Sequence, residues 1–213
     1  MIHTTLARLR EAGACTKGYP KLASYLGGIS AYGRDTPIPL TVVLDSNGFD
    51  DVLLCLRATI EDSAQFARLL ACDYAEHVVR LTTDPRPART IAVARRYANG
   101  RATEAELEDA AYASAMAGDA AYAVAKEVAK AAGVDPADCT EMAPAYAAYS
   151  AARAAMAPDA VGWSARDAAY KAEWAVDALD TSGAVAGTEW SAAVEAERTW
   201  QTDRLRTALE ATA

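Results

Sequence analysis

The chain has 213 residues, of which 52% are hydrophobic and about a quarter are alanine, and its formal net charge is -8. This length and apolar content suffice for a genuine globular core and argue against a disordered chain. Because phosphate repels an acidic chain, the charge also argues against direct binding of nucleic acid.

Alanine favours helices over strands, so we expect an all-α fold, an alanine-rich multi-helix bundle. In the first part of the chain we expect helices at 4–12 and 19–26, each stopped by glycine. A loop rich in Gly and Pro should then run to Pro39. Two compact apolar segments follow, one ending at Asn47-Gly48 and one around 52–56.

Apolar residues recur at helical spacing from Asp62 to Leu81, which predicts the central helix of the fold, with Asp62 as its N-cap. Asp84-Pro85 combines a cap with proline at the first helical position and predicts a helix to Asn99-Gly100. Residues 103–106 match the capping box S/T-x-x-E and open a long alanine-rich helix that Gly133 should end.

Prolines at 136, 144 and 158 predict an irregular or kinked segment. Two further helices are expected at 164–181 and 188–211, separated by glycines. The halves differ in charge, since residues 1–102 carry 13 basic and 10 acidic side chains, and residues 103–213 carry 8 and 19. We therefore expect a slightly basic N-terminal lobe, 1–102, and an acidic alanine-rich lobe, 103–213, packed as a single continuous domain.

The four cysteines are far apart and follow no secretory leader pattern, so we expect neither disulfides nor a zinc site, and we expect a cytoplasmic protein. The apolar stretches fall short of the roughly 20 residues that span a membrane. No membrane role is expected.

Cys72, Asp73 and His77 are the residues that come nearest to a catalytic or metal site. Asp73 and His77 at i, i+4 share a helix face and could hold a metal or form an acid–base pair. The alternative is a histidine at the edge of the core, paired with Asp73. Since three or four ligands are needed for a metal and no phosphate-binding or nucleophile motif occurs, we expect no enzyme, no cofactor and no metal.

The basic run from Arg80 to Arg101 could contact phosphate, or it could pair internally with the acidic segment that follows it. The sequence leaves both interpretations open.

The predicted partner-binding residues are acidic and lie in the C-terminal half. Glu173, Asp177 and Asp180 follow i, i+4, i+7 spacing on one helix, and Glu104, Glu108 and Asp109 begin another. A solvated acidic face is the alternative. A stripe that mimics phosphate spacing would attract a basic protein.

Several segments resemble those of the Imm5-like immunity proteins, alanine-rich helical proteins of phages and bacteria. They are "LREAGAC", "LDSNGFDDVLLCLRA", "ARLLACDYAEHVV", "DPRPARTIAVARRYANGRATEAELEDA" and "ERTWQTDRLRTAL", in this order. Residues 110–186 match only in their alanine content. The resemblance implies a helical, non-enzymatic protein of a toxin-immunity locus or mobile element that acts by binding another protein.

We therefore expect an inhibitor of the toxin-immunity or phage counter-defence (anti-CRISPR-like) type. It would occlude a basic or nucleic-acid-binding surface of a toxin, nuclease or defence-complex subunit. The alternative is a self-associating structural or scaffolding protein, and a homo-oligomer is compatible with both.

Overall fold

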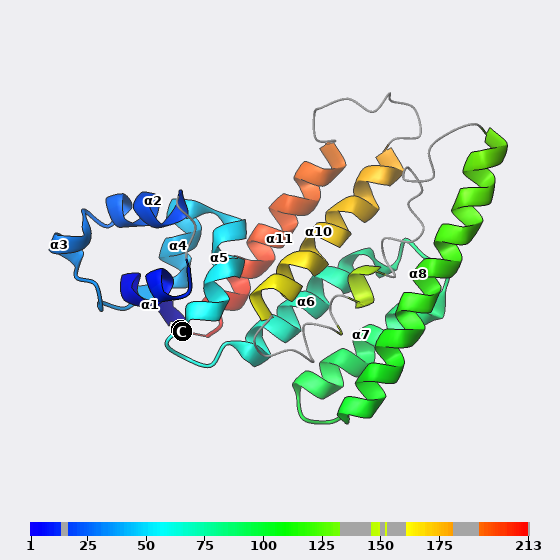
Figure 1. Cartoon of the computed structure of the whole chain (residues 1–213), viewed down its shortest axis with the longest axis horizontal. Coiled ribbons are helices and arrows are strands. Elements are labelled where there is room, and N and C mark those ends of the chain that lie inside the picture. The colour runs from blue at the N-terminus through cyan, green and yellow to red at the C-terminus, as the bar shows by residue number, and fades with distance from the viewer. Residues whose placement is uncertain (14–16, 133–145, 150–151, 153–160, 181–191, 213) are drawn as a thin grey trace.

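The computed structural model describes residues 1–13, 17–132, 146–149, 152, 161–180 and 192–212 (Figure 1). Helices make up most of these residues, and the strands among them form a two-stranded sheet. The all-α prediction is confirmed.

The N-terminal part of the chain consists of short helices. They are α1 (Leu6–Glu11), α2 (Gly18–Tyr25), α3 (Ile29–Tyr32), α4 (Leu40–Asn47), α5 (Phe49–Cys55) and the 3-10 turn η1 (Leu56–Ala58). Gly48, with a φ of 95°, lies between α4 and α5. Glycine adopts this left-handed conformation without the steric cost that other residues incur, which explains why one helix ends and the next begins there.

The first predicted helix begins later than expected. His3 and Thr4 form strand β1 (His3–Thr4), which pairs antiparallel with β2 (Ile38–Pro39), within the predicted loop. Thr5 is the N-cap, and its hydroxyl accepts a 3.1 Å hydrogen bond from the Arg8 backbone N–H. The sheet was missed because a two-residue pairing depends on a partner far along the chain.

The second part consists of longer helices. They are α6 (Ala64–Val79), α7 (Pro85–Ala98), α8 (Glu104–Ala132), α10 (Val161–Asp180) and α11 (Ala192–Glu210). Helix α6 is central, as predicted, and packs against α7, α10 and α11. Helix α8 packs against α7 at the end of the molecule farthest from α1 to α3 (Figure 1).

Two predicted caps are present in the structure. The Asp84 carboxylate accepts a 2.8 Å hydrogen bond from the Arg86 backbone N–H at the start of α7. At the start of α8, the Thr103 backbone N–H donates to Glu106 Oε2 (2.7 Å) and the Glu106 backbone N–H donates to Thr103 Oγ1 (3.2 Å). For α6 the N-cap is Ser63, while Asp62 accepts from the Ala64 N–H.

Two groups of buried side chains meet at α6. One combines the leucine-rich N-terminal helices with Leu70 and Tyr74 of α6 and with Leu205 and Leu209 of α11. The other joins α6, α7, α8 and α10 and consists largely of alanine. Alanine lets helices approach closely but buries little area, so the leucines of the first group supply much of the hydrophobic stabilisation. Helix α11 thus closes the N-terminal core from the far end of the chain.

We expect Leu205→Ala to lower the free energy of unfolding by about 2–5 kcal/mol, because this side chain is fully buried in the N-terminal core. Glu210→Ala, at an exposed position of the same helix, is the control and should change it by less than about 0.5 kcal/mol. Urea unfolding followed by circular dichroism measures both. Equal decreases in the free energy of unfolding of the two variants would show that Leu205 of α11 does not stabilise the N-terminal core.

Candidate functional site

The predicted Asp73–His77 pair does not form. The Asp73 carboxylate receives Arg95 of α7 and Arg204 of α11, each at 2.6 Å. His77 Nδ1 lies 2.7 Å from Glu197 Oε2 of α11, and its ring stacks on Trp200 at 3.6 Å between centroids. The acid–base pair and the pairing of a core-edge His77 with Asp73 are therefore both wrong, because each residue has its partner on another helix.

Cys72 is buried between the helices, and desolvation raises the pKa of its thiol to about 12. The thiolate, which is the nucleophilic form, is therefore strongly disfavoured at neutral pH. Among the described residues, His, Cys, Asp and Glu side chains form no group that could hold a metal ion.

Glu173, the first residue of the predicted acidic stripe, is buried and not exposed. Its side chain is 2% exposed, with Oε1 2.5 Å from Arg198 Nε and Oε2 2.9 Å from Arg198 Nη2. Burial raises the pKa of this carboxyl, although Arg198 opposes the shift. The prediction that Glu173 contacts a partner directly is therefore corrected, because its carboxylate is buried against Arg198. The side chains of Asp177 and Asp180, on the last turns of α10, lie outside the described residues.

The sequence contained a signal for this interior network that the stripe interpretation missed. Glu197 and Gln201 precede Leu205 and Leu209 at successive spacings of four residues, so they continue an apolar helix face. Both are buried, and Gln201 donates to Glu197 Oε1 and to the Ala169 carbonyl O, each at 3.0 Å. A polar residue on an apolar helix line indicates a partner on a neighbouring helix.

The other three predicted partner-binding residues, Glu104, Glu108 and Asp109, are all exposed on α8. From Glu104 to Ala125 this helix carries five acidic residues and no basic residue. Residues 108, 109, 112, 116 and 119 fall at i, i+1, i+4, i+8 and i+11 and so share one side of the helix. We call Glu108, Asp109, Tyr112, Met116 and Asp119 the outer face of α8.

This outer face presents apolar surface as well as negative charge. Tyr112 is 67% exposed and Met116 is 37% exposed, and Tyr122 (41%) lies at the edge of the face. Tyrosine and methionine are enriched where proteins bind one another. Asp119 accepts a 2.9 Å hydrogen bond from the Tyr146 hydroxyl, which holds one carboxylate of the face in place.

The basic run is partly paired within the chain. Arg86 pairs with Asp84, Arg95 with Asp73 and Glu76, and Arg96 with Glu106 of α8. All three arginines pair internally, but only Arg96 pairs with the acidic segment that follows the run, as that interpretation predicted.

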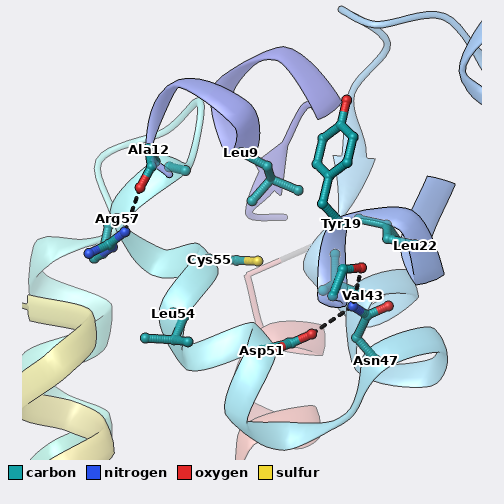
Figure 2. Close-up of a pocket in the computed structure, with 12 residues that line it drawn as sticks. Leu9, Ala12, Tyr19, Leu22, Val43, Asn47, Asp51, Leu54, Cys55 and Arg57 are labelled. Atoms are coloured by element: carbon teal, nitrogen blue, oxygen red, sulfur yellow. Dashed lines mark hydrogen bonds between the residues drawn. The ribbon is translucent and has the colours of Figure 1, made fainter. Parts of the chain in front are cut away.

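A small apolar pocket lies among the N-terminal helices, with Leu9, Tyr19, Leu22 and Val43 among its walls (Figure 2). Its volume is about 70 Å³, whereas small-molecule sites occupy about 300–1,000 Å³. At its edge Asn47 Nδ2 donates to the Gly18 carbonyl O at 2.8 Å and to Asp51 Oδ2 at 2.7 Å. The Asn47 amide is thus already hydrogen-bonded within the protein, and the pocket is smaller than small-molecule sites.

No protein-family model, curated protein or solved structure matches the chain. No helix in the described part of the chain is both long and apolar enough to span a membrane.

We expect the raised pKa of Glu173 to give the protein a specific pH dependence. Between its ordinary value of 4.5 and the higher folded value, the folded state binds more protons than the unfolded chain. This group's contribution to the free energy of unfolding therefore falls as the pH rises through that window. Glu173→Gln removes this contribution. The free energy of unfolding of the wild type minus that of the variant should therefore fall with rising pH.

Urea unfolding between about pH 4 and pH 8 measures this difference. Glu195→Gln, at an exposed position of α11, is the control and should follow the wild type. A wild-type minus Glu173→Gln difference that stays constant with pH would contradict the shift.

Proposed function

We propose that this is a non-enzymatic, cytoplasmic binding protein that neutralises a basic partner protein by covering its functional surface. The observation that carries the proposal is the outer face of α8, which combines exposed acidic side chains with exposed Tyr112 and Met116. Charge of one sign steers a basic partner and speeds its capture, while apolar contacts slow its release.

The helix itself benefits from part of this charge, since acidic residues near an N-terminus interact favourably with the helix dipole. Asp119 lies four turns into α8, beyond the reach of that effect, which falls off within the first turn. Tyr112 is uncharged, so the helix dipole does not explain its exposure either. A partner surface accounts for all of these features together.

The resemblance to immunity proteins supports a partner that is a toxin, a nuclease or a subunit of a defence complex. A partner of these classes that acts on nucleic acid would present a basic surface, because Lys and Arg neutralise the phosphates. An immunity protein and a phage counter-defence protein would both act by binding and covering a basic surface, so the proposal covers both.

We expect Glu108→Lys with Asp109→Lys to abolish partner capture, because the substitution turns attraction into repulsion. Affinity purification from nuclease-treated bacterial lysate at low and high salt, with mass spectrometry, measures capture. The control is Glu11→Lys with Asp35→Lys, which changes the net charge equally at exposed positions of the N-terminal part. The expected result is a basic protein that wild type and control retain at low salt, that high salt releases, and that the α8 variant does not retain. Equal retention by the α8 variant would overturn the role of the outer face.

Self-association is the second candidate, and one feature of α8 favours it. Exposed Lys126 and Lys130 lie on the same side as Tyr112, two to three turns beyond Asp119. Two copies of α8 packed antiparallel would place the acidic start of each face near the lysines of the other. Such pairing would bury Tyr112 and Met116 in a homodimer.

We expect Lys126→Glu with Lys130→Glu to separate these candidates. Under the inhibitor proposal this variant keeps the oligomeric state of the wild type and captures its basic partner at least as well, because the face becomes more acidic. Under self-association, the wild type is a dimer in sedimentation analysis and the variant a monomer. Mixing the variant with Glu108→Lys/Asp109→Lys protein would then restore a heterodimer.

A further inference from the structure

Three aromatic rings lie around the ammonium group of Lys171, on α10. The Nζ atom lies over the ring faces, 4.9 Å from the centroid of Trp174, 5.6 Å from that of Tyr170 and 6.0 Å from that of Tyr146. A cation within about 6 Å of a ring centroid is attracted by the negative potential of the ring face. The position of this atom is therefore favourable for a cation with respect to three rings at once.

The rings, and not a carboxylate, account for the position of this ammonium group. Within the part of the chain that the structure describes, the Lys171 side chain forms no ion pair and no hydrogen bond. A primary ammonium is compact and strongly hydrated, so it gains little by leaving water for the rings. The side chain is also partly exposed and can turn into solvent. Lys171 therefore marks a place for a cation from which another cation can displace it.

Contacts with α8 hold the ring of Tyr146 in place. Tyr146 belongs to the helical segment 146–149, which lies between α8 and α10 (Figure 1). Its hydroxyl donates to Asp119 Oδ1 at 2.9 Å. A methyl group in place of the Gly118 hydrogen would lie 3.1 Å from Tyr146 Cζ, so glycine at this position of α8 lets the ring pack closely against the helix. These contacts do not involve Lys171.

The three rings can be reached from solvent. Tyr170 is 56% exposed, and Trp174 and Tyr146 are partly exposed. Tyr170 and Trp174 are four residues apart, so they lie on the same side of α10. A ligand that approaches this side of the helix meets the faces of the rings once the lysine side chain has turned away.

The chemistry of the rings selects the ligand. Arg166 and Asp167, about one turn before Lys171, carry opposite charges, so net charge does not select it. The negative ring faces attract a cation and disfavour an anion. A quaternary ammonium group spreads its charge over methyl groups and has no N–H to hydrate, so it leaves water at a lower cost than the ammonium of lysine.

We propose that Tyr146, Tyr170 and Trp174 form an aromatic cage that binds a trimethylammonium group, and that Lys171 is the occupant that this group displaces. Choline-type small molecules and trimethylated lysine side chains both carry such a group. The cage uses the outer face of α8 only through Asp119, which holds Tyr146. The inference therefore goes beyond the proposed function and does not depend on it.

Titration with choline chloride tests the cage on the isolated protein. The chemical shift of the Trp174 indole N–H, assigned by its absence from Trp174→Phe, reports binding, and sodium chloride keeps the ionic strength constant. We expect a shift that saturates. The uncharged isostere, in which a tert-butyl group replaces the trimethylammonium group, should bind much more weakly, because it has the same shape but no charge.

A second probe, N-acetyl-Nε-trimethyl-L-lysine amide, distinguishes the two sources of the group. Tighter binding of this probe than of choline would support a trimethylated lysine side chain as the ligand, and the reverse would support a choline-type molecule. Equal binding would show that the cage recognises the trimethylammonium group alone.

Lys171→Ala gives the sharpest result, because removing the competing ammonium should tighten choline binding by roughly two- to tenfold. Tyr170→Ala, at an exposed position, should weaken it by about two- to fivefold, through the loss of one cation–π contact. Tyr25→Ala removes an exposed ring in the N-terminal part and should leave choline binding unchanged. Neither Lys171 nor Tyr170 is buried, so we expect both variants to fold.

Equal binding of choline and its uncharged isostere would overturn the inference, as would a shift that does not saturate. Unchanged or weaker binding of choline by Lys171→Ala would also overturn it. Titration with sodium phosphate tests the opposite charge, and a saturating shift that is lost in Lys171→Ala would show an anion site at this lysine instead of a cage for a cation.

Discussion

The fold depends on one constraint, that a carboxylate removed from water must have a partner. Asp73, Glu173 and Glu197 lie where α6, α10 and α11 meet, and each has its partner on a different helix from its own. Removing one partner of such a buried pair costs about 3–5 kcal/mol, because the remaining charge is left uncompensated. These contacts add little net stability themselves, but all of them require that α11 present Glu197, Arg198 and Arg204 to α6 and α10.

Once α11 is fixed in this way, the rest of the arrangement follows. Its leucines complete the core of the N-terminal helices, while its arginines reach α5, α6 and α10. Alanines on α6 and α10 let these two helices lie close together. The last helix of the acidic half thereby joins the slightly basic first half of the chain.

The same network separates structural charges from those available to a partner. Carboxylates in the interior are committed to arginine or histidine, whereas those of the outer face of α8 are exposed. Asp50 is intermediate, since it is half exposed and shared by two arginines. The pairs that hold the helices together are therefore distinct from the exposed carboxylates of α8.

The sequence by itself determined the elements whose causes are local. The Thr103–Glu106 capping box, the cap at Asp84 and the glycine at 48 act within a few residues, so helix boundaries could be predicted from them. Alanine content and apolar spacing determined the fold class and the central place of α6 for the same reason. The exposure of Glu108 and Asp109 also followed from their position on a helix.

Only the tertiary structure decided which charges pair. Spacing placed Asp73 beside His77 and Glu173 in an acidic stripe, but the actual partners are Arg204, Glu197 and Arg198. His77 and Glu197 are 120 residues apart, and a helical repeat shows which residues share a face, not which helix covers it. The physical reason is that burial depends on the packing of whole helices, and burial determines whether a carboxylate stabilises the fold or remains available to another molecule.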